Sequence, residues 1–76
     1  MSKTVFELAI VDLVRVKRKD SKLSQAKIAD VLKVTPGYIG QVEMKTSPSM
    51  YSYDQLNELA KFFNCSPKDF MPDAPL

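Results

Sequence analysis

The side chains that usually carry out catalysis or bind metal ions are scarce in this sequence. None of the 76 residues is histidine, and Cys65 is the single cysteine. Ser-His-Asp and Cys-His catalytic devices therefore lack their base, and a Cys/His zinc site cannot be assembled. The sequence also has no paired carboxylates at motif spacing and no glycine-rich phosphate loop. We therefore expect no enzymatic activity, no metal or other cofactor, and no small-molecule ligand.

The remaining chemistry is electrostatic, because the charges are unevenly distributed. The net charge is only +2, but residues 15–33 contain seven basic and two acidic side chains, a net charge of +5. Residues 51–76 contain two basic and four acidic side chains. A basic patch of this kind fits a polyanion such as nucleic acid. The alternative is a solvated helix end, because cations are favoured near helix C-termini in any case.

The length and composition indicate one small globular domain. Hydrophobic residues make up 45% of the chain and charged residues 26%, which is ordinary for a soluble protein. The apolar runs are too short to span a membrane. The N-terminus lacks the apolar block and cleavage site of a signal peptide. We therefore expect a cytoplasmic protein without membrane contact.

Capping signals predict five helices and no strand. Thr4 and Glu7 form a capping box, and Pro36 stands at a first helical position, where its missing N–H costs nothing. The predicted helices cover residues 4–19, 24–32, 35–44, 52–63 and 66–70. The predicted fold class is therefore all-α, with a compact five-helix domain over residues 4–71 and a short tail at residues 72–76.

Helical periodicity assigns the inward faces. In the first helix, one face at about 100° per residue is predicted to turn inward. It consists of Phe6, Ala9, Ile10, Leu13 and Val16. Leu8 and Val11 then lie on the opposite side, where they are too apolar for a simple solvent face and indicate a contact surface. The predicted core consists of Phe6, Leu13, Ile28, Leu32, Val34, Ile39, Val42, Leu56, Leu59, Phe63 and Phe70.

Residues 24–44 have the pattern of a helix-turn-helix, two short helices joined by a tight turn. Ala29 is small enough for the two helices to cross closely, and Val34 can anchor the turn. Ile39 and Val42 lie about one turn apart and face inward. The outer face of the second helix is then free to enter a major groove.

Residues 23–44, LSQAKIADVLKVTPGYIGQVEM, resemble the helix-turn-helix of the lambdoid phage repressor/Cro-like family of bacterial transcriptional regulators. Residues 53–63, YDQLNELAKFF, and residues 64–70, NCSPKDF, are similar to the fourth and fifth helices of that family. The resemblance extends over about residues 4–71. It implies a compact, lambda-repressor-like domain of five helices that binds double-stranded DNA.

The resemblance also implies phosphate contacts from two segments. Gln25 matches a phosphate-binding glutamine at the start of the second helix, where the helix N-terminus is itself an anion site. Lys45, Thr46 and Ser47 match phosphate contacts of the loop after the third helix. The alternatives are an ordinary surface residue and a mobile loop. The complete set of predicted DNA-contact residues is Ser24, Gln25, Lys27, Pro36, Gly37, Tyr38, Gly40, Gln41, Lys45, Thr46 and Ser47.

The base-reading positions of the family fall on residues with little side chain. They correspond to Pro36, Gly37, Gly40 and Gln41, and Gln41 alone has a side chain that reads a base edge, with adenine as its natural partner. Tyr38 flanks the groove, where it either binds a phosphate or packs at the edge of the core. We therefore expect this helix to make few direct contacts with base edges.

The resemblance includes an internal ion pair but not the usual glycines. Glu43 is expected to pair with Lys17 or Arg18 at the end of the first helix. Lys33 stands in the turn where glycine is common, so a lysine must adopt a positive φ. The glycine usual after the third helix is absent at residues 44–45.

Two functions fit these observations. The first is a sequence-directed transcriptional regulator that inserts its third helix into the major groove as a homodimer on a two-fold site. The basic residues 15–33 and Gln25 favour this function. The alternative is a protein-interaction or antitoxin-like module whose helix-turn-helix has lost base readout. The scarcity of base-reading side chains in the third helix favours the alternative, and so do the apolar residues Leu8 and Val11 on the first helix.

Overall fold

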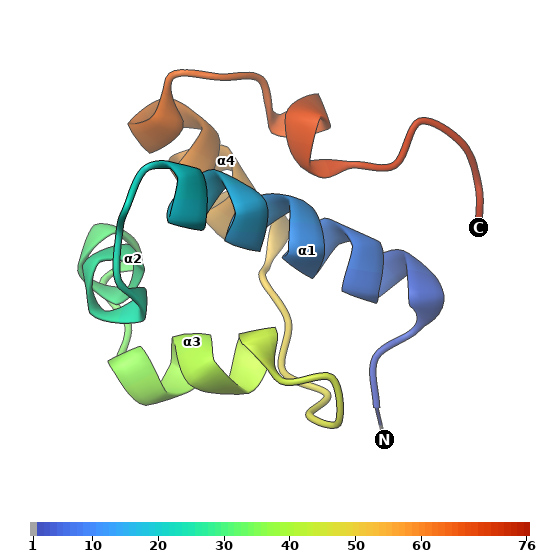
Figure 1. Ribbon diagram of the computed structural model, residues 1–76, viewed down its shortest axis with the longest axis horizontal. Coiled ribbons are helices and arrows are strands. Elements are labelled where there is room, and N and C mark those ends of the chain that lie inside the picture. The colour runs from blue at the N-terminus through green and yellow to red at the C-terminus, as the bar shows by residue number, and fades with distance from the viewer. Residues whose placement is uncertain (1) are drawn as a thin grey trace.

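The computed structural model describes residues 2–76 and contains four α-helices followed by one turn of 3-10 helix (Figure 1). The elements are α1 (Val5–Asp20), α2 (Gln25–Leu32), α3 (Pro36–Glu43), α4 (Tyr53–Phe63) and η1 (Pro67–Phe70). No strand occurs within the described residues. The predicted all-α class is confirmed, but the fifth helix is a four-residue 3-10 turn, because Pro72 follows it closely and prevents its extension.

Each helix begins at a hydroxyl side chain that accepts a hydrogen bond from a backbone amide of the first turn. These N-caps are Thr4, Ser24, Thr35, Ser52 and Ser66. The helices α2 and α4 end in left-handed residues, Lys33 with φ 58° and Asn64 with φ 55°. Local sequence therefore determines where the elements start and stop, including the predicted positive φ of Lys33.

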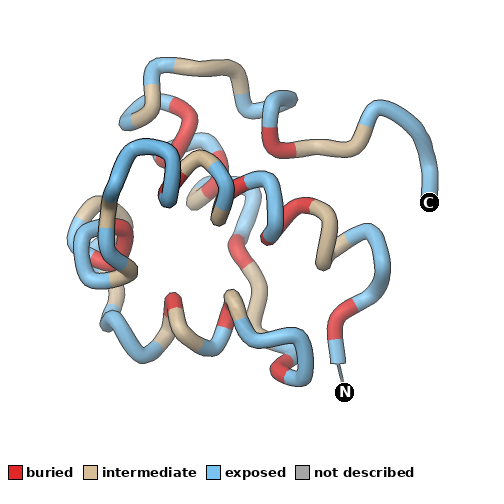
Figure 2. The backbone as a smooth tube through the Cα atoms, viewed as in Figure 1, coloured by how far each residue is buried: buried red, intermediate tan, exposed pale blue. Residues whose placement is uncertain are grey.

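The first helix lies in the middle of the molecule, between α3 and η1 (Figure 1). The second helix packs against both α3 and α4. Buried segments of α3 face α1, and exposed segments face away from it (Figure 2). The outer side of α3 therefore forms one edge of the molecule.

The inward face of α1 differs from the predicted one. Ile10, Val11 and Val14 are buried, and Val14 has 0% exposed surface. Phe6 and Leu13 are partly exposed, Val16 is 57% exposed, and Leu8 is half-buried. The inward placement of Ile10 is therefore confirmed. The assignment of Phe6 and Leu13 to the core, of Val16 to the inward face and of Val11 to the opposite side was wrong.

The physical reason is that α1 has apolar residues on two faces, and periodicity cannot choose between them. Val14 and Arg18 are four residues apart and share the face that turns inward. Arg18 is buried because it pairs with Glu43 of α3, and this pair brings its own face of α1 to the interior. The rest of the predicted core is confirmed as buried or as packed against the buried cluster: Ile28, Leu32, Val34, Ile39, Val42, Leu56, Leu59, Phe63 and Phe70.

Candidate nucleic-acid interface

The outer face of α3 is open and nearly free of large polar side chains. Pro36, Gly37 and Gln41 are exposed, and Gly40 is half-buried. The inward side chains of this helix are Ile39 and Val42, both with 0% exposed surface. A helix with one fully buried face and small residues on the other can approach another surface closely. Here Gln41 supplies the amide that projects from that face.

A buried carboxylate stands at the C-terminal end of α3. The Glu43 side chain is 6% exposed and receives two hydrogen bonds from Arg18, from Nε at 3.0 Å and from Nη2 at 2.9 Å. Arg15 Nε lies 3.6 Å from the same carboxylate. Among the predicted partners, the structure therefore selects Arg18 and not Lys17. Bidentate pairing of this kind is strong because the charges meet in a fixed planar geometry.

The charge of Glu43 is stabilised despite its burial. Burial by itself raises the pKa of a carboxyl group, because the charged form loses its hydration. Hydrogen bonds from Arg18 and Gln25, together with the positive charges of Arg18 and Arg15, outweigh that effect, so the pKa of Glu43 lies below its ordinary value. Glu43 is therefore an ionised acceptor at neutral pH.

Gln25, in the first turn of α2, is tied to this carboxylate. Its Nε2 donates to Glu43 Oε1 at 2.9 Å. Its Oε1 lies beside Gly40, 3.7 Å from the position that a Cβ atom on Gly40 would occupy. The side chain that the sequence assigns to a phosphate contact is thus held at the junction of α2 and α3.

The loop after α3 is fixed by a lysine from the N-terminal segment. Lys3 is buried, and its Nζ donates to the carbonyl oxygens of Gln41, Met44 and Ser47 at 3.3, 2.7 and 2.7 Å. Arg15 Nη2 donates to the Glu43 carbonyl at 2.6 Å. Two cations therefore bind the C-terminal carbonyls of a helix that lacks a terminal glycine.

Sequence analysis missed Lys3, and no local pattern could have found it. The residues that Lys3 contacts lie 38 to 44 positions away in the chain. Burial lowers the pKa of the Lys3 ammonium group, while Glu7 raises it and Arg15 lowers it by their charges. The three carbonyl acceptors nevertheless use all three N–H donors of the charged form.

The predicted loop contacts divide into two groups. Lys45 and Thr46 are exposed. Ser47 is buried, and its hydroxyl accepts a hydrogen bond from the Ser49 amide at 3.2 Å. The structure therefore places Ser47 inside the loop, where it shapes the turn, and this differs from the surface position that a phosphate contact needs.

Two further predicted contacts also make intramolecular interactions. The Tyr38 hydroxyl donates to the Met50 carbonyl at 2.5 Å, which fits the core-edge alternative and holds the loop against α3. Lys27 is exposed, but its ammonium lies 3.9 Å from the Asp30 carboxylate and 6.0 Å from the ring centre of Phe62 in α4. The side chain of Lys27 is thus directed toward α4.

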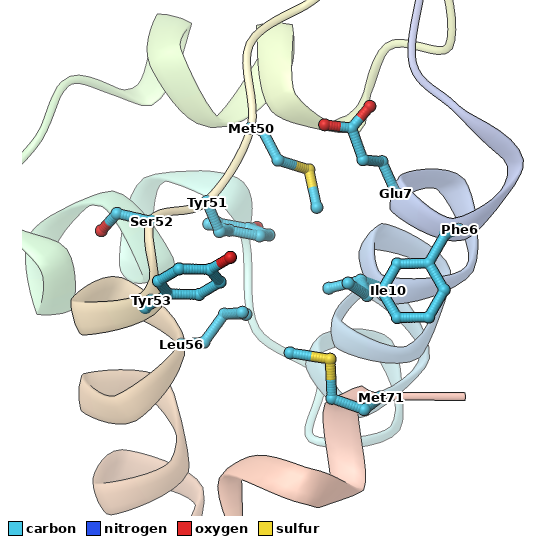
Figure 3. Close-up of a pocket in the computed structure, with 9 residues that line it drawn as sticks. All are labelled: Phe6, Glu7, Ile10, Met50, Tyr51, Ser52, Tyr53, Leu56 and Met71. Carbon is cyan, nitrogen blue, oxygen red and sulfur yellow. The ribbon is translucent and has the colours of Figure 1, made fainter. Parts of the chain in front are cut away.

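A second surface feature is an apolar groove of about 450 Å³ on another side of the molecule. Phe6 and Ile10 of α1 line one wall, Tyr53 and Leu56 of α4 line the opposite one, and Met71 lies between them (Figure 3). The groove has no catalytic grouping of polar side chains. Its chemistry is that of a contact surface.

Tyr51 also lines this groove, and its hydroxyl is buried. Its Oη has no hydrogen-bond partner among the described residues. Burial raises the pKa of this hydroxyl well above its ordinary value, and the charge of Glu43 adds to that shift. The tyrosine is therefore neutral and serves as a core side chain.

Residues 2–76 contain neither a metal-binding cluster nor a membrane-spanning helix. Histidine, cysteine and acidic side chains in this range do not gather in any group of three suited to a metal ion. Every helix in the same range is too short or too polar to span a lipid bilayer.

The arrangement of α2 and α3, joined by a tight turn with α3 open on one side, defines a helix-turn-helix protein. The model of the helix-turn-helix family to which repressor/Cro-like domains belong matches residues 14–70. The chain belongs to this family, which supports a DNA-binding helix-turn-helix regulator. A comparison with curated proteins gave no match.

Several solved structures share the fold at low sequence identity. Hydroxypropylphosphonic acid epoxidase from S. wedmorenis in complex with fosfomycin superposes with a TM-score of 0.77 and 21% identity, over 95% of this chain and 38% of that chain. FeII HppE in complex with substrate gives a TM-score of 0.75 and 22% identity, over 91% of this chain and 38% of that one. CoII HppE in complex with Tris buffer gives a TM-score of 0.78 and 21% identity, over 95% of this chain and 40% of that chain.

This chain spans about two fifths of the length of those solved chains. At such low identity, the likeness concerns the fold alone. It confirms that the arrangement of α1 to η1 occurs as one part of longer proteins.

Proposed function

We propose that the protein is a sequence-directed DNA-binding regulator that inserts α3 into the major groove. The observation that carries this proposal is the outer face of α3, where Gly37 and Gln41 are exposed and Gly40 has no side chain; α3 itself forms one edge of the molecule (Figure 1). A major groove about 12 Å wide admits an α-helix. Gln41 is the side chain on that face that can read a base edge.

The proposed phosphate contacts flank this helix. Lys45 and Thr46 are exposed on the loop that leaves α3. Ser24 caps the N-terminus of α2, whose positive dipole end favours an anion nearby. Lys27 stands in the same first turn but on the α4 side. Such contacts fix the position of a protein on the duplex without reading its sequence.

The proposal is tested by selecting bound sequences from random duplex DNA and measuring the salt dependence of the binding. We expect an enriched sequence motif, together with a fall in affinity as salt rises, because each neutralised phosphate contributes a slope of about 0.9. Salt-dependent binding without any preferred sequence would remove the sequence-directed part of the proposal. Absence of DNA binding at all salt concentrations would favour the protein-interaction or antitoxin-like alternative.

We further propose that the protein acts as a homodimer, weak when free and firmer on DNA. Two-fold DNA sites place half-sites about 34 Å apart, which two copies can occupy together. The exposed apolar face of α1, formed by Val5, Phe6, Leu13 and Val16, continues into the groove beside Tyr53, which is 87% exposed. This is a contact surface for a second copy.

The size of this apolar surface favours a weak dimer. It consists of five side chains, whereas a stable interface has about 20–30 residues per partner. Stable interfaces bury about 800 Å² per partner. Homodimer formation is tested by sedimentation of the protein with and without a palindromic duplex. We expect Val16→Glu to abolish pairing on DNA while the fold persists; a wild-type monomer bound singly to every duplex would contradict it.

A further inference from the structure

We propose that Gln25 is a specificity-determining residue: its amide, oriented by Glu43, presents Oε1 beside Gly40 to an exocyclic amino group of adenine or cytosine in the major groove. This inference rests on the proposed insertion of α3 into DNA. It changes the role expected for Gln25 from a phosphate contact to a base contact.

The carboxylate of Glu43 determines which way the Gln25 amide faces. An ionised carboxylate only accepts hydrogen bonds, so the amide must turn its NH2 group toward it. The Nε2–Oε1 distance of 2.9 Å fits a hydrogen bond to a charged acceptor. Glu43 is itself held by Arg18 and cannot rotate freely. The orientation of the Gln25 amide is therefore fixed before any DNA arrives.

The carbonyl oxygen of Gln25 consequently lies on the flank of α3 where Gly40 has no side chain. Gly40 falls between the buried side of α3 and its outer face, and a Cβ there would lie 3.7 Å from Oε1. A longer side chain at this position would extend over the oxygen. Glycine leaves Oε1 uncovered at the edge of the surface that faces the groove.

The acceptor character of Oε1 distinguishes its possible DNA partners. Phosphate oxygens are also acceptors, so Oε1 cannot bind them, and only the second N–H of the amide remains for such a contact. In the major groove, adenine N6 and cytosine N4 are donors. Pro36, Gly37 and Gly40 offer no side-chain partner to the bases that they approach. Gln25 supplies from α2 an acceptor that α3 lacks at this position.

The test removes single amino groups from the DNA. In the duplex obtained by selection, each adenine is replaced in turn by purine and each cytosine by 2-pyrimidinone, which lack only the exocyclic amino group. Wild-type protein and Gln25→Met are titrated with every duplex. At one position per half-site, we expect removal of the amino group to lower the affinity of the wild type about tenfold, the cost of one lost base contact. At the same position, the affinity of Gln25→Met should not differ between the modified and the unmodified duplex.

A second measurement avoids any change at Gln25. In Gln41→Ala, the loss at the Gln25 position should persist, while the loss at any position read by Gln41 disappears. The inference would be overturned if every amino deletion affected wild type and Gln25→Met equally and Gln25→Met bound all duplexes more weakly by the same factor. That result would indicate a phosphate contact instead. If the wild type binds no duplex at all, the proposed function fails and this inference fails with it.

Discussion

The guanidinium of Arg18 holds the carboxylate of Glu43 by two hydrogen bonds, at 3.0 and 2.9 Å, and so joins α1 to the C-terminal end of α3. Both side chains are nearly excluded from solvent. The same carboxylate receives Gln25 from α2. The carboxylate of Glu43 thus connects α1, α2 and α3, and these contacts position α3 in the fold.

Removing Arg18 should therefore be costly. Arg18→Met leaves a buried carboxylate with less compensation, and breaking a buried pair in this way costs about 3–5 kcal/mol of unfolding free energy. Lys19→Met is the matched control, because Lys19 is an exposed cation in the same turn of α1 and does not pair with Glu43; a surface change of this kind costs within about 0.5 kcal/mol. Chemical denaturation measures both. Equal losses would show that the pair does not support the fold.

The lowered pKa of Glu43 predicts a dependence of stability on pH. A carboxyl group with a pKa below its unfolded value of about 4.3 stabilises the fold above that pH, and this contribution is lost as the pH falls through the folded pKa. The difference in unfolding free energy between wild type and Glu43→Gln should therefore be largest near neutral pH and shrink below about pH 4. Urea titrations at several pH values test this. A difference that stays constant into acid would contradict an ionised Glu43.

Two valines on the same helix test which face of α1 is buried. Val14 has 0% exposed surface and Val16 has 57%. Val14→Ala should cost about 2 kcal/mol, from lost burial and the cavity left behind, whereas Val16→Ala should cost within about 0.5 kcal/mol. The substitutions are chemically identical, so thermal melts of the two variants compare position alone. A larger loss of stability for Val16→Ala than for Val14→Ala would instead support the inward face that periodicity predicted.

Lys3 should stabilise the loop after α3. Lys3→Met keeps most of the side-chain length but loses three hydrogen bonds, to the carbonyls of Gln41, Met44 and Ser47. Leaving such buried groups unsatisfied costs about 1–3 kcal/mol, and the effect should concentrate in faster hydrogen exchange of the Met44 and Ser47 amides. Lys19→Met, at an exposed position of α1, is the control. Unchanged exchange at these amides would mean that the loop does not depend on Lys3.

The sequence predicts the start of every element because capping is local. A hydroxyl residue at the N-cap and its partner three positions later suffice, as Ser52 and Gln55 show. The inward face of α1 could not be predicted in the same way, since that helix has two apolar faces. Its rotation depends on Glu43, which lies 25 residues after Arg18. The contacts of Lys3 are more distant still and leave no pattern in the sequence.

The candidate interface could be predicted in position but not in detail. The resemblance places Gln25, Gln41 and Lys45 around α3, and the structure brings Gln25 to α3 and leaves Gln41 and Lys45 exposed. Burial of Ser47 and the direction of Lys27 toward α4 follow from contacts made only in the folded chain. Side-chain direction is decided by packing, which a linear motif does not contain.

The central claim, that α3 reads DNA through Gln41, is tested most directly by titrating Gln41→Ala and Lys45→Ala with the selected duplex and with random duplex over a range of salt. Gln41→Ala should lose about 1–3 kcal/mol on the selected duplex and little on random DNA, with an unchanged salt slope. Lys45→Ala should weaken both duplexes alike and reduce the slope by about one. If Gln41→Ala weakens the two duplexes equally, α3 does not read bases and the claim is contradicted.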